Sequence, residues 1–61
     1  MATTAEFLRK ITRAGFRLID HGKKHDVYEN RLSGKRVIVA RHSKELANGT
    51  YRSMLRDAGL S

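Results

Sequence analysis

With only 61 residues and no cysteine, this chain must fold without disulfide bonds or cysteine-ligated zinc. Residues 1–61 are expected to form a single domain, because the chain is too short for two. A domain of this size buries only about 60% of the surface that its unfolded chain exposes. Its hydrophobic core is therefore expected to be thin, and a partner chain is one means by which such a domain gains stability.

Membrane insertion is not expected. The sequence has no apolar run near the roughly 20 residues that a membrane-spanning helix needs. The first ten residues include Glu6, Arg9 and Lys10, and they lack the apolar core of a signal peptide. Basic residues are spread along the chain rather than gathered on one helix face, which argues against binding to a membrane surface. We expect a soluble protein of the cytoplasm.

Positive charge dominates the composition. Thirteen lysine and arginine residues stand against six aspartate and glutamate residues, giving a net charge of +7 at pH 7. Eight of the thirteen are arginines, whose planar guanidinium matches phosphate better than a lysine ammonium does. Nucleic acid is the usual partner of so basic a small domain. The alternative is a basic soluble protein without a polyanionic ligand.

The N-terminal segment carries the signals of a helix over residues 4–14. Thr3 and Glu6 have the spacing of a capping box, in which each residue satisfies a free backbone N–H of the first turn. Apolar residues follow at helical spacing, namely Phe7, Leu8, Ile11 and Ala14. Gly15 then provides the residue that commonly ends a helix in the left-handed conformation.

Three strands are predicted next, over residues 16–19, 25–30 and 36–40. The first alternates apolar and polar residues, and the last is rich in β-branched residues, which favour strands. A polar stretch over 20–24 separates the first two strands, and a turn around Ser33-Gly34 joins the second to the third. Short connections of this kind favour antiparallel hairpins.

The C-terminal part is predicted to hold an irregular segment or single helical turn over 41–46 and then a helix over 50–58. Asn48 or Gly49 is the expected cap of that helix, and Gly59 is its expected end. Its apolar residues fall on one side, namely Tyr51, Met54, Leu55 and Ala58.

The order α-β-β-β-α predicts an α+β fold with two layers. Helices this short are not stable alone, so each must lay its apolar side on the sheet. We expect a three-stranded antiparallel sheet with two helices on one face and the other face open to solvent or a ligand. Double-stranded-RNA-binding modules share this plan, although a fold by itself does not define an activity.

Three segments, taken in order, resemble the HicA family of toxin ribonucleases. They are Lys23-Lys24-His25-Asp26-Val27-Tyr28, Val37-Ile38-Val39-Ala40-Arg41-His42, and the stretch from Gly49-Thr50-Tyr51-Arg52 to Gly59-Leu60. His25 holds the position of the family's histidine. Lys23-Lys24 replaces the usual Gly-Ser before it, Ala40 stands where proline is common, and Tyr51 replaces a leucine.

The resemblance implies a double-stranded-RNA-binding-like fold and metal-independent cleavage of mRNA without a cofactor. It also implies neutralisation by an antitoxin of the HicB type in a hetero-oligomeric complex. Within this resemblance, His25 is the expected catalytic residue.

The chemistry of RNA explains why one histidine is a sensible catalyst. The 2′-hydroxyl attacks the adjacent phosphate, so the protein has to move protons and stabilise charge. Histidine has a reference pKa of about 6.5, so it accepts or gives a proton near neutral pH. Cations that are expected to contact RNA are Lys23, Lys24, Arg17, Arg36 and Arg41; which arginines hold the phosphate is left open.

The other polar candidates have plainer interpretations. His42 is either a second acid–base group or a structural residue at a strand edge, and no metal site is expected from the three histidines. Tyr28 and Tyr51 are expected to pack in or near the core rather than stack on bases. Asp26 and Glu29 are interpreted as solvated strand residues.

Two other functions are consistent with these features. One is a non-catalytic RNA-binding module, which has the same charge and fold. The other is a subunit that works mainly by binding an acidic protein. A toxin covered by its antitoxin also fits the second description, with an acidic antitoxin surface expected over His25.

Overall fold

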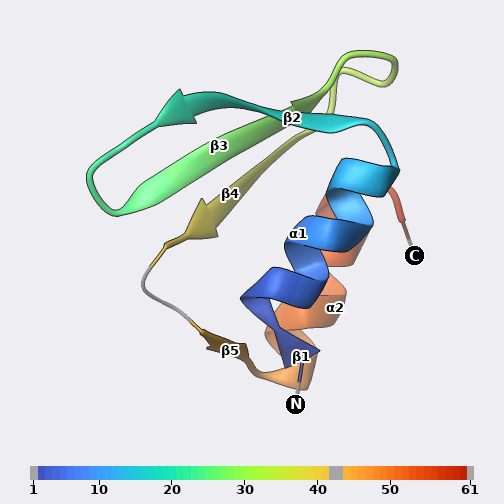
Figure 1. Cartoon of the computed structure of the whole chain (residues 1–61). Helices are drawn as coiled ribbons and strands as arrows, with labels where there is room; N and C mark the ends of the chain where they lie inside the picture. Colours follow the sequence, from blue (N-terminus) through green and yellow to red (C-terminus); the bar gives the residue numbers. More distant parts are fainter. Residues whose placement is uncertain (1, 42–43, 61) are drawn as a thin grey trace.

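The computed structural model describes residues 2–41 and 44–60. Its elements, in chain order, are β1 (Ala2–Thr3), α1 (Thr4–Arg13), β2 (Phe16–His21), β3 (His25–Asn30), β4 (Arg36–Ala40), β5 (Glu45–Leu46) and α2 (Asn48–Asp57). Strands β2, β3 and β4 form an antiparallel sheet in that order, and both helices lie on one of its faces (Figure 1). The predicted α+β architecture is confirmed.

Helix α1 begins and ends where its sequence signals place it. The Thr3 hydroxyl accepts a hydrogen bond from the Glu6 backbone N–H at 3.1 Å, which satisfies one free donor of the first turn. Gly15 follows the helix with φ of +106°, a left-handed conformation that glycine adopts without a steric penalty.

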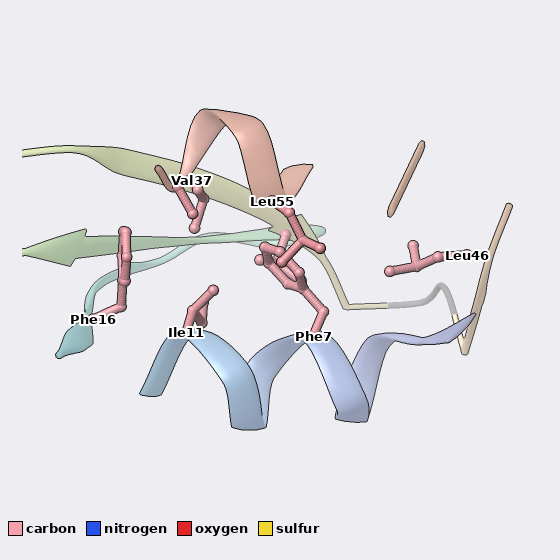
Figure 2. Close-up of a cluster of buried hydrophobic side chains, with 8 residues drawn as sticks. Phe7, Ile11, Phe16, Val37, Leu46 and Leu55 are labelled. Carbon is pink, nitrogen blue, oxygen red and sulfur yellow. The ribbon is translucent and has the colours of Figure 1, made fainter. Parts of the chain in front are cut away.

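The core lies between the helices and the sheet. Phe7 and Ile11 of α1 are fully buried, and Leu55 of α2 lies beside them (Figure 2). The sheet and connections complete the cluster with Phe16, Val37, Val39, Leu46 and Ala58. Burying one large apolar side chain contributes about 1.5–3 kcal/mol, so this small set carries most of the stability.

The register of the sheet decides which residues face the helices. Asp26 lies opposite Val39, and both are buried on the helix-covered face. Val27 lies opposite Ile38 on the other face, where Ile38 is 64% exposed. Because side chains alternate along a strand, His25 and Glu29 share the open face with Val27.

Asn30 ties the end of α1 to the turn between β3 and β4. Its side-chain amide donates to the Ala14 carbonyl at 3.0 Å, and its carbonyl oxygen accepts from the backbone N–H of Leu32 at 2.9 Å. This buried side chain fixes the helix layer against one end of the sheet.

Three details differ from the sequence predictions. Strand β2 extends to His21 rather than ending at residue 19, because pairing with β3 continues past a register shift between Leu18 and Asp20. The segment after β4 contains β5, which pairs with β1 at Ala2–Thr3 and so makes a second, two-stranded sheet.

The third difference is the start of α2. The helix begins at Asn48 after an N-cap at Ala47, and no side chain caps it. The expectation that Asn48 or Gly49 is the cap is wrong, because both already belong to the helix. Within the described residues, no helix has the length and apolar character to cross a membrane.

Candidate functional site

His25 is exposed at the tip of the β2–β3 hairpin. It is the first residue of β3, and it lies opposite Ala40, the last residue of β4. Figure 1 shows that this end of the sheet projects beyond the helix layer. The predicted catalytic side chain is therefore accessible on the outer surface of the molecule.

The turn before His25 is tight and needs glycine at its start. The Gly22 backbone N–H donates to the His25 carbonyl at 2.9 Å. A Cβ at position 22 would lie 2.6 Å from that same oxygen, closer than nonbonded atoms approach. Lys23 and Lys24 form the exposed loop of the turn, so two cations lie directly beside His25.

Arg41 holds this turn from the end of β4. Its backbone N–H donates to the Lys24 carbonyl at 3.0 Å, and its guanidinium donates to the carbonyls of Gly22 and Lys23. Arginine suits this task because its planar group presents several donors in fixed directions. The carbonyls of three consecutive residues, Gly22, Lys23 and Lys24, thus all accept hydrogen bonds from Arg41.

A His21–Asp26 pair lies against the same arginine. His21 Nδ1 is 2.9 Å from Asp26 Oδ1, and Arg41 Nε is 3.7 Å from that oxygen. The Arg41 guanidinium also hydrogen-bonds to the His21 ring. Asp26 Oδ1 is buried and has no hydrogen-bond partner among the described residues, so its contacts with His21 and Arg41 are close approaches rather than hydrogen bonds.

This network changes the interpretation of Asp26. Its side chain is only 12% exposed, so the prediction of a solvated residue is wrong. Asp26 faces the helix side of the sheet at the projecting tip, and Arg41 covers it there. A buried carboxylate needs such a cation, since the cost of desolvating an unpaired charge is large.

Arg17 and Arg36 lie away from His25. Both flank Glu29, Arg17 from β2 and Arg36 from β4. Arg36 Nε is 2.8 Å from Glu29 Oε2, so Glu29 is half-buried in an ion pair rather than simply solvated. Glu29 and His25 are four residues apart on one strand, which corresponds to about 13 Å. The candidates therefore divide into a group at the hairpin tip and a pair farther along the open face.

The two tyrosines pack as expected. Tyr28 and Tyr51 are half-buried against the core cluster, and the Tyr51 ring meets the Phe7 ring edge-on. Burial, and then the nearby Asp26 carboxylate, raise the pKa of Tyr28 above its usual value of 10.0. Its hydroxyl therefore stays neutral throughout the physiological range.

Histidine and carboxylate side chains do not gather into a metal site in the described part of the chain, where groups of three or more are absent. His42 lies outside the described residues, so its two alternative roles stay predictions.

Comparison with known proteins places this geometry in a family. Residues 4–60 match the family described as the HicA toxin of bacterial toxin–antitoxin systems. The match spans nearly the whole folded region, from the start of α1 to the third residue after α2. This chain belongs to the HicA toxin family. None of the curated proteins matches it. The HicA-type fold thus presents His25 on a projecting hairpin whose turn is held by Arg41.

The sequence analysis missed the His21–Asp26–Arg41 network. The His21–Asp26 pair could have been predicted from the sequence. A two-residue turn at Lys23–Lys24 places Gly22 opposite His25, and the next pair along the hairpin is then His21 and Asp26. What the sequence does not show is that Arg41 turns back over this pair rather than pointing into solvent.

Proposed function

We propose that this HicA-family chain is a toxin that cleaves mRNA without a metal ion or other cofactor, and that His25 is its catalytic residue. The observation that carries the proposal is an exposed histidine beside two exposed lysines, on the projecting end of a HicA-type fold. Positive charge at that end favours the approach of a polyanionic strand.

The proposed step uses the RNA's own 2′-hydroxyl as the nucleophile. The His25 imidazole takes the proton from that hydroxyl as O2′ bonds to phosphorus, or it gives a proton to the departing O5′ as the P–O5′ bond breaks. The other proton is exchanged with solvent water, and the products are a 2′,3′-cyclic phosphate and a 5′-hydroxyl end; the step consumes no water and needs no metal. A well-placed acid or base of this kind typically contributes about 10²–10⁴ in rate.

The cations have different proposed roles, according to their distance from His25. Lys23 and Lys24 are adjacent to it and are proposed to contact the phosphate that reacts. Arg17 and Arg36 are proposed to contact the strand farther along the open face, where Arg36 already binds Glu29. Arg41 lies at the same turn as these lysines, but its guanidinium already binds the turn carbonyls.

The test is a comparison of the wild type with His25→Ala. We expect purified wild type to cut mRNA in the presence of EDTA and leave cyclic phosphate ends, and the variant to be about 10²–10⁴-fold slower. Expression of the variant is expected to leave host growth and mRNA decay unchanged. Leu32→Ala is the control, because Leu32 is 96% exposed on the distant β3–β4 turn.

Equal toxicity and cleavage in His25→Ala would remove His25 from the mechanism. If the wild type binds RNA but forms no new ends on long incubation, the alternative of a non-catalytic RNA-binding module replaces the ribonuclease.

We further propose that the protein acts in the bacterial cytoplasm and is neutralised by a HicB-type antitoxin. Membership of a toxin–antitoxin family supports a protein partner, and the net charge of +7 supports an acidic contact surface on it. An acidic surface over His25 would occupy the place of RNA and inhibit the toxin by competition.

A further inference from the structure

Helix α1 carries three cations on its exposed side, away from the core. Arg9, Lys10 and Arg13 are all exposed, whereas Phe7 and Ile11 of the same helix face the sheet. None of the ion pairs among residues 2–41 and 44–60 involves these three cations. By contrast, Arg36 and Arg41 already bind carboxylates or carbonyls of this chain.

These cations line a groove between the two helices. Its walls are made by Glu6, Arg9, Lys10 and Arg13 of α1 and by Tyr51 of α2. Lys10 Nζ lies 5.6 Å above the centre of the Tyr51 ring, a cation–π contact that holds this ammonium at the groove. With one acid against three cations, the groove keeps a net positive charge.

Helix stabilisation explains only part of this arrangement. Lys10 and Arg13 lie in the last turn of α1, where cations interact favourably with the helix dipole. Arg9 lies before that turn, and it lines the groove one helical turn from Arg13. Two guanidinium groups at this spacing lie on the same side of the helix, so both are available to one ligand.

The groove is separate from the proposed cleavage site. His25 lies on the open face of the sheet at the projecting hairpin, whereas α1 and α2 form the opposite layer (Figure 1). The Cα atoms span 29 × 28 × 15 Å, so the molecule is small enough for one RNA strand of several nucleotides to reach both surfaces.

We propose that the α1 groove, formed by Arg9, Lys10, Arg13 and Tyr51, is a second phosphate-binding surface for RNA. It binds the backbone of the same strand at nucleotides outside the segment at His25. Free guanidinium groups next to a positively charged groove match the repeated, evenly charged phosphates of a nucleic acid. The effect on cleavage rests on the proposed ribonuclease function, whereas the binding itself does not.

The binding test uses single-stranded RNA and a His25→Ala background, which keeps the RNA intact. We expect Arg9→Gln/Arg13→Gln to weaken RNA binding about tenfold at physiological salt and to reduce the slope of log K against log salt by about 1.4, or ~0.7 for each lost phosphate contact. The control is Arg52→Gln/Arg56→Gln, which removes the same charge at the same spacing from exposed positions on α2.

The outcomes separate the groove from total charge. If both double variants lose the same affinity and slope, net charge explains the binding and the groove is not a site. If the α1 variant binds RNA normally but loses affinity for the antitoxin, the surface is a protein contact and the proposal is wrong. Circular dichroism checks that α1 remains helical, since glutamine is a good helix former.

The cleavage test uses the active protein with RNAs of two lengths. We expect Arg9→Gln/Arg13→Gln to cut a long mRNA several-fold more slowly at low concentration. The same variant should cut an RNA of about two nucleotides at the wild-type rate, because that RNA holds only the phosphate that reacts and cannot reach the α1 groove. If the variant cuts both RNAs at the wild-type rate, the second surface is overturned and the ribonuclease proposal is unaffected. Absence of cleavage by the wild type would instead overturn the proposed function.

Discussion

Gly22 makes the close turn at His25 possible, and its role is steric. The missing side chain allows the Gly22 N–H to donate to the His25 carbonyl, at a place where a Cβ would be 2.6 Å from that oxygen. The obstacle is backbone rather than a flexible side chain, so the strand itself has to move to relieve it. The position of His25 therefore depends on a residue that has no chemistry of its own.

We expect Gly22→Ala to lower the free energy of unfolding by about 1–3 kcal/mol, the usual cost of forcing extra atoms into a packed site. Cleavage should fall roughly 10–100-fold, because shifting a catalytic group by about 1 Å costs up to that much. Urea denaturation and a cleavage assay measure the two effects.

Gly49→Ala is the matched control for this substitution. Gly49 lies in α2, and a Cβ there meets nothing within 4 Å. Alanine should stabilise the helix by up to ~1 kcal/mol and leave cleavage unchanged. If Gly22→Ala also leaves cleavage unchanged and does not lower the free energy of unfolding, the turn accommodates a Cβ at position 22 and the steric argument is wrong.

At the residue level, the sequence predicted what depends on local pattern. An exposed His25 and packed Tyr28 and Tyr51 follow from their places in strands and helices. The burial of Asp26 was not predictable from pattern, because a carboxylate between His25 and Val27 has the appearance of a solvated strand residue. Asp26 is buried because Arg41, 15 residues later in the sequence, lies across the hairpin tip and contacts it.

Among the elements, strand β4 does more than complete the sheet. Its end delivers Arg41 to the β2–β3 turn, and so a residue from the third sheet strand fixes the loop between the first two. The turn extends beyond the helices (Figure 1), so the core does not support it. Hydrogen bonds from Arg41 hold this turn in place, whereas packing against the helices holds the rest of the sheet.

We expect Arg41→Lys to keep the charge but lose the fork of donors, and therefore to lower the free energy of unfolding by about 1–3 kcal/mol. Exchange of amide hydrogens in residues 22–25 should become faster than in the wild type, because the turn opens locally. The cleavage rate should fall as these amides lose their protection from exchange.

Arg36→Lys provides the comparison, since Arg36 begins the strand that Arg41 follows and its exposed guanidinium pairs with Glu29. Exposed pairs contribute about 0–1 kcal/mol, so a small change is expected. Equal effects of the two substitutions would show that Arg41 has no special role in holding the turn.

Element boundaries were predictable where glycine or a β-branched run marks them. Gly15 and Gly59 follow the two helices with positive φ, and β4 matches its predicted bounds. Strands β1 and β5 were not predictable, because two residues show no alternation. The cap of α2 was missed because Ala47, a residue with no capping side chain, occupies the position.

On the scale of the whole molecule, positive charge occupies both layers while the core remains thin. The helix layer carries Arg9, Lys10 and Arg13, and the hairpin tip carries Lys23 and Lys24. Such a molecule gains from any acidic partner in two ways, through relief of repulsion among its cations and through binding energy added to folding. The proposed antitoxin satisfies both.

We expect the antitoxin to place acidic residues over His25 and to bind less tightly as salt concentration rises. At a free concentration 100 times Kd, it should add about 2.7 kcal/mol to the free energy of unfolding. Calorimetry at several salt concentrations and a structure of the complex measure these effects. A complex with His25 open to solvent would show that inhibition works by another route, such as distortion of the hairpin.

The β1–β5 pair has a consequence for synthesis of the protein. Ala2 and Thr3 pair with Leu46 and Glu45, more than forty residues later in the sequence. During translation this pairing forms only after residue 46 has left the ribosome, and α2 follows later still. A chain interrupted before α2 lacks one of the two helices that cover the sheet, so we expect such a fragment to stay unfolded.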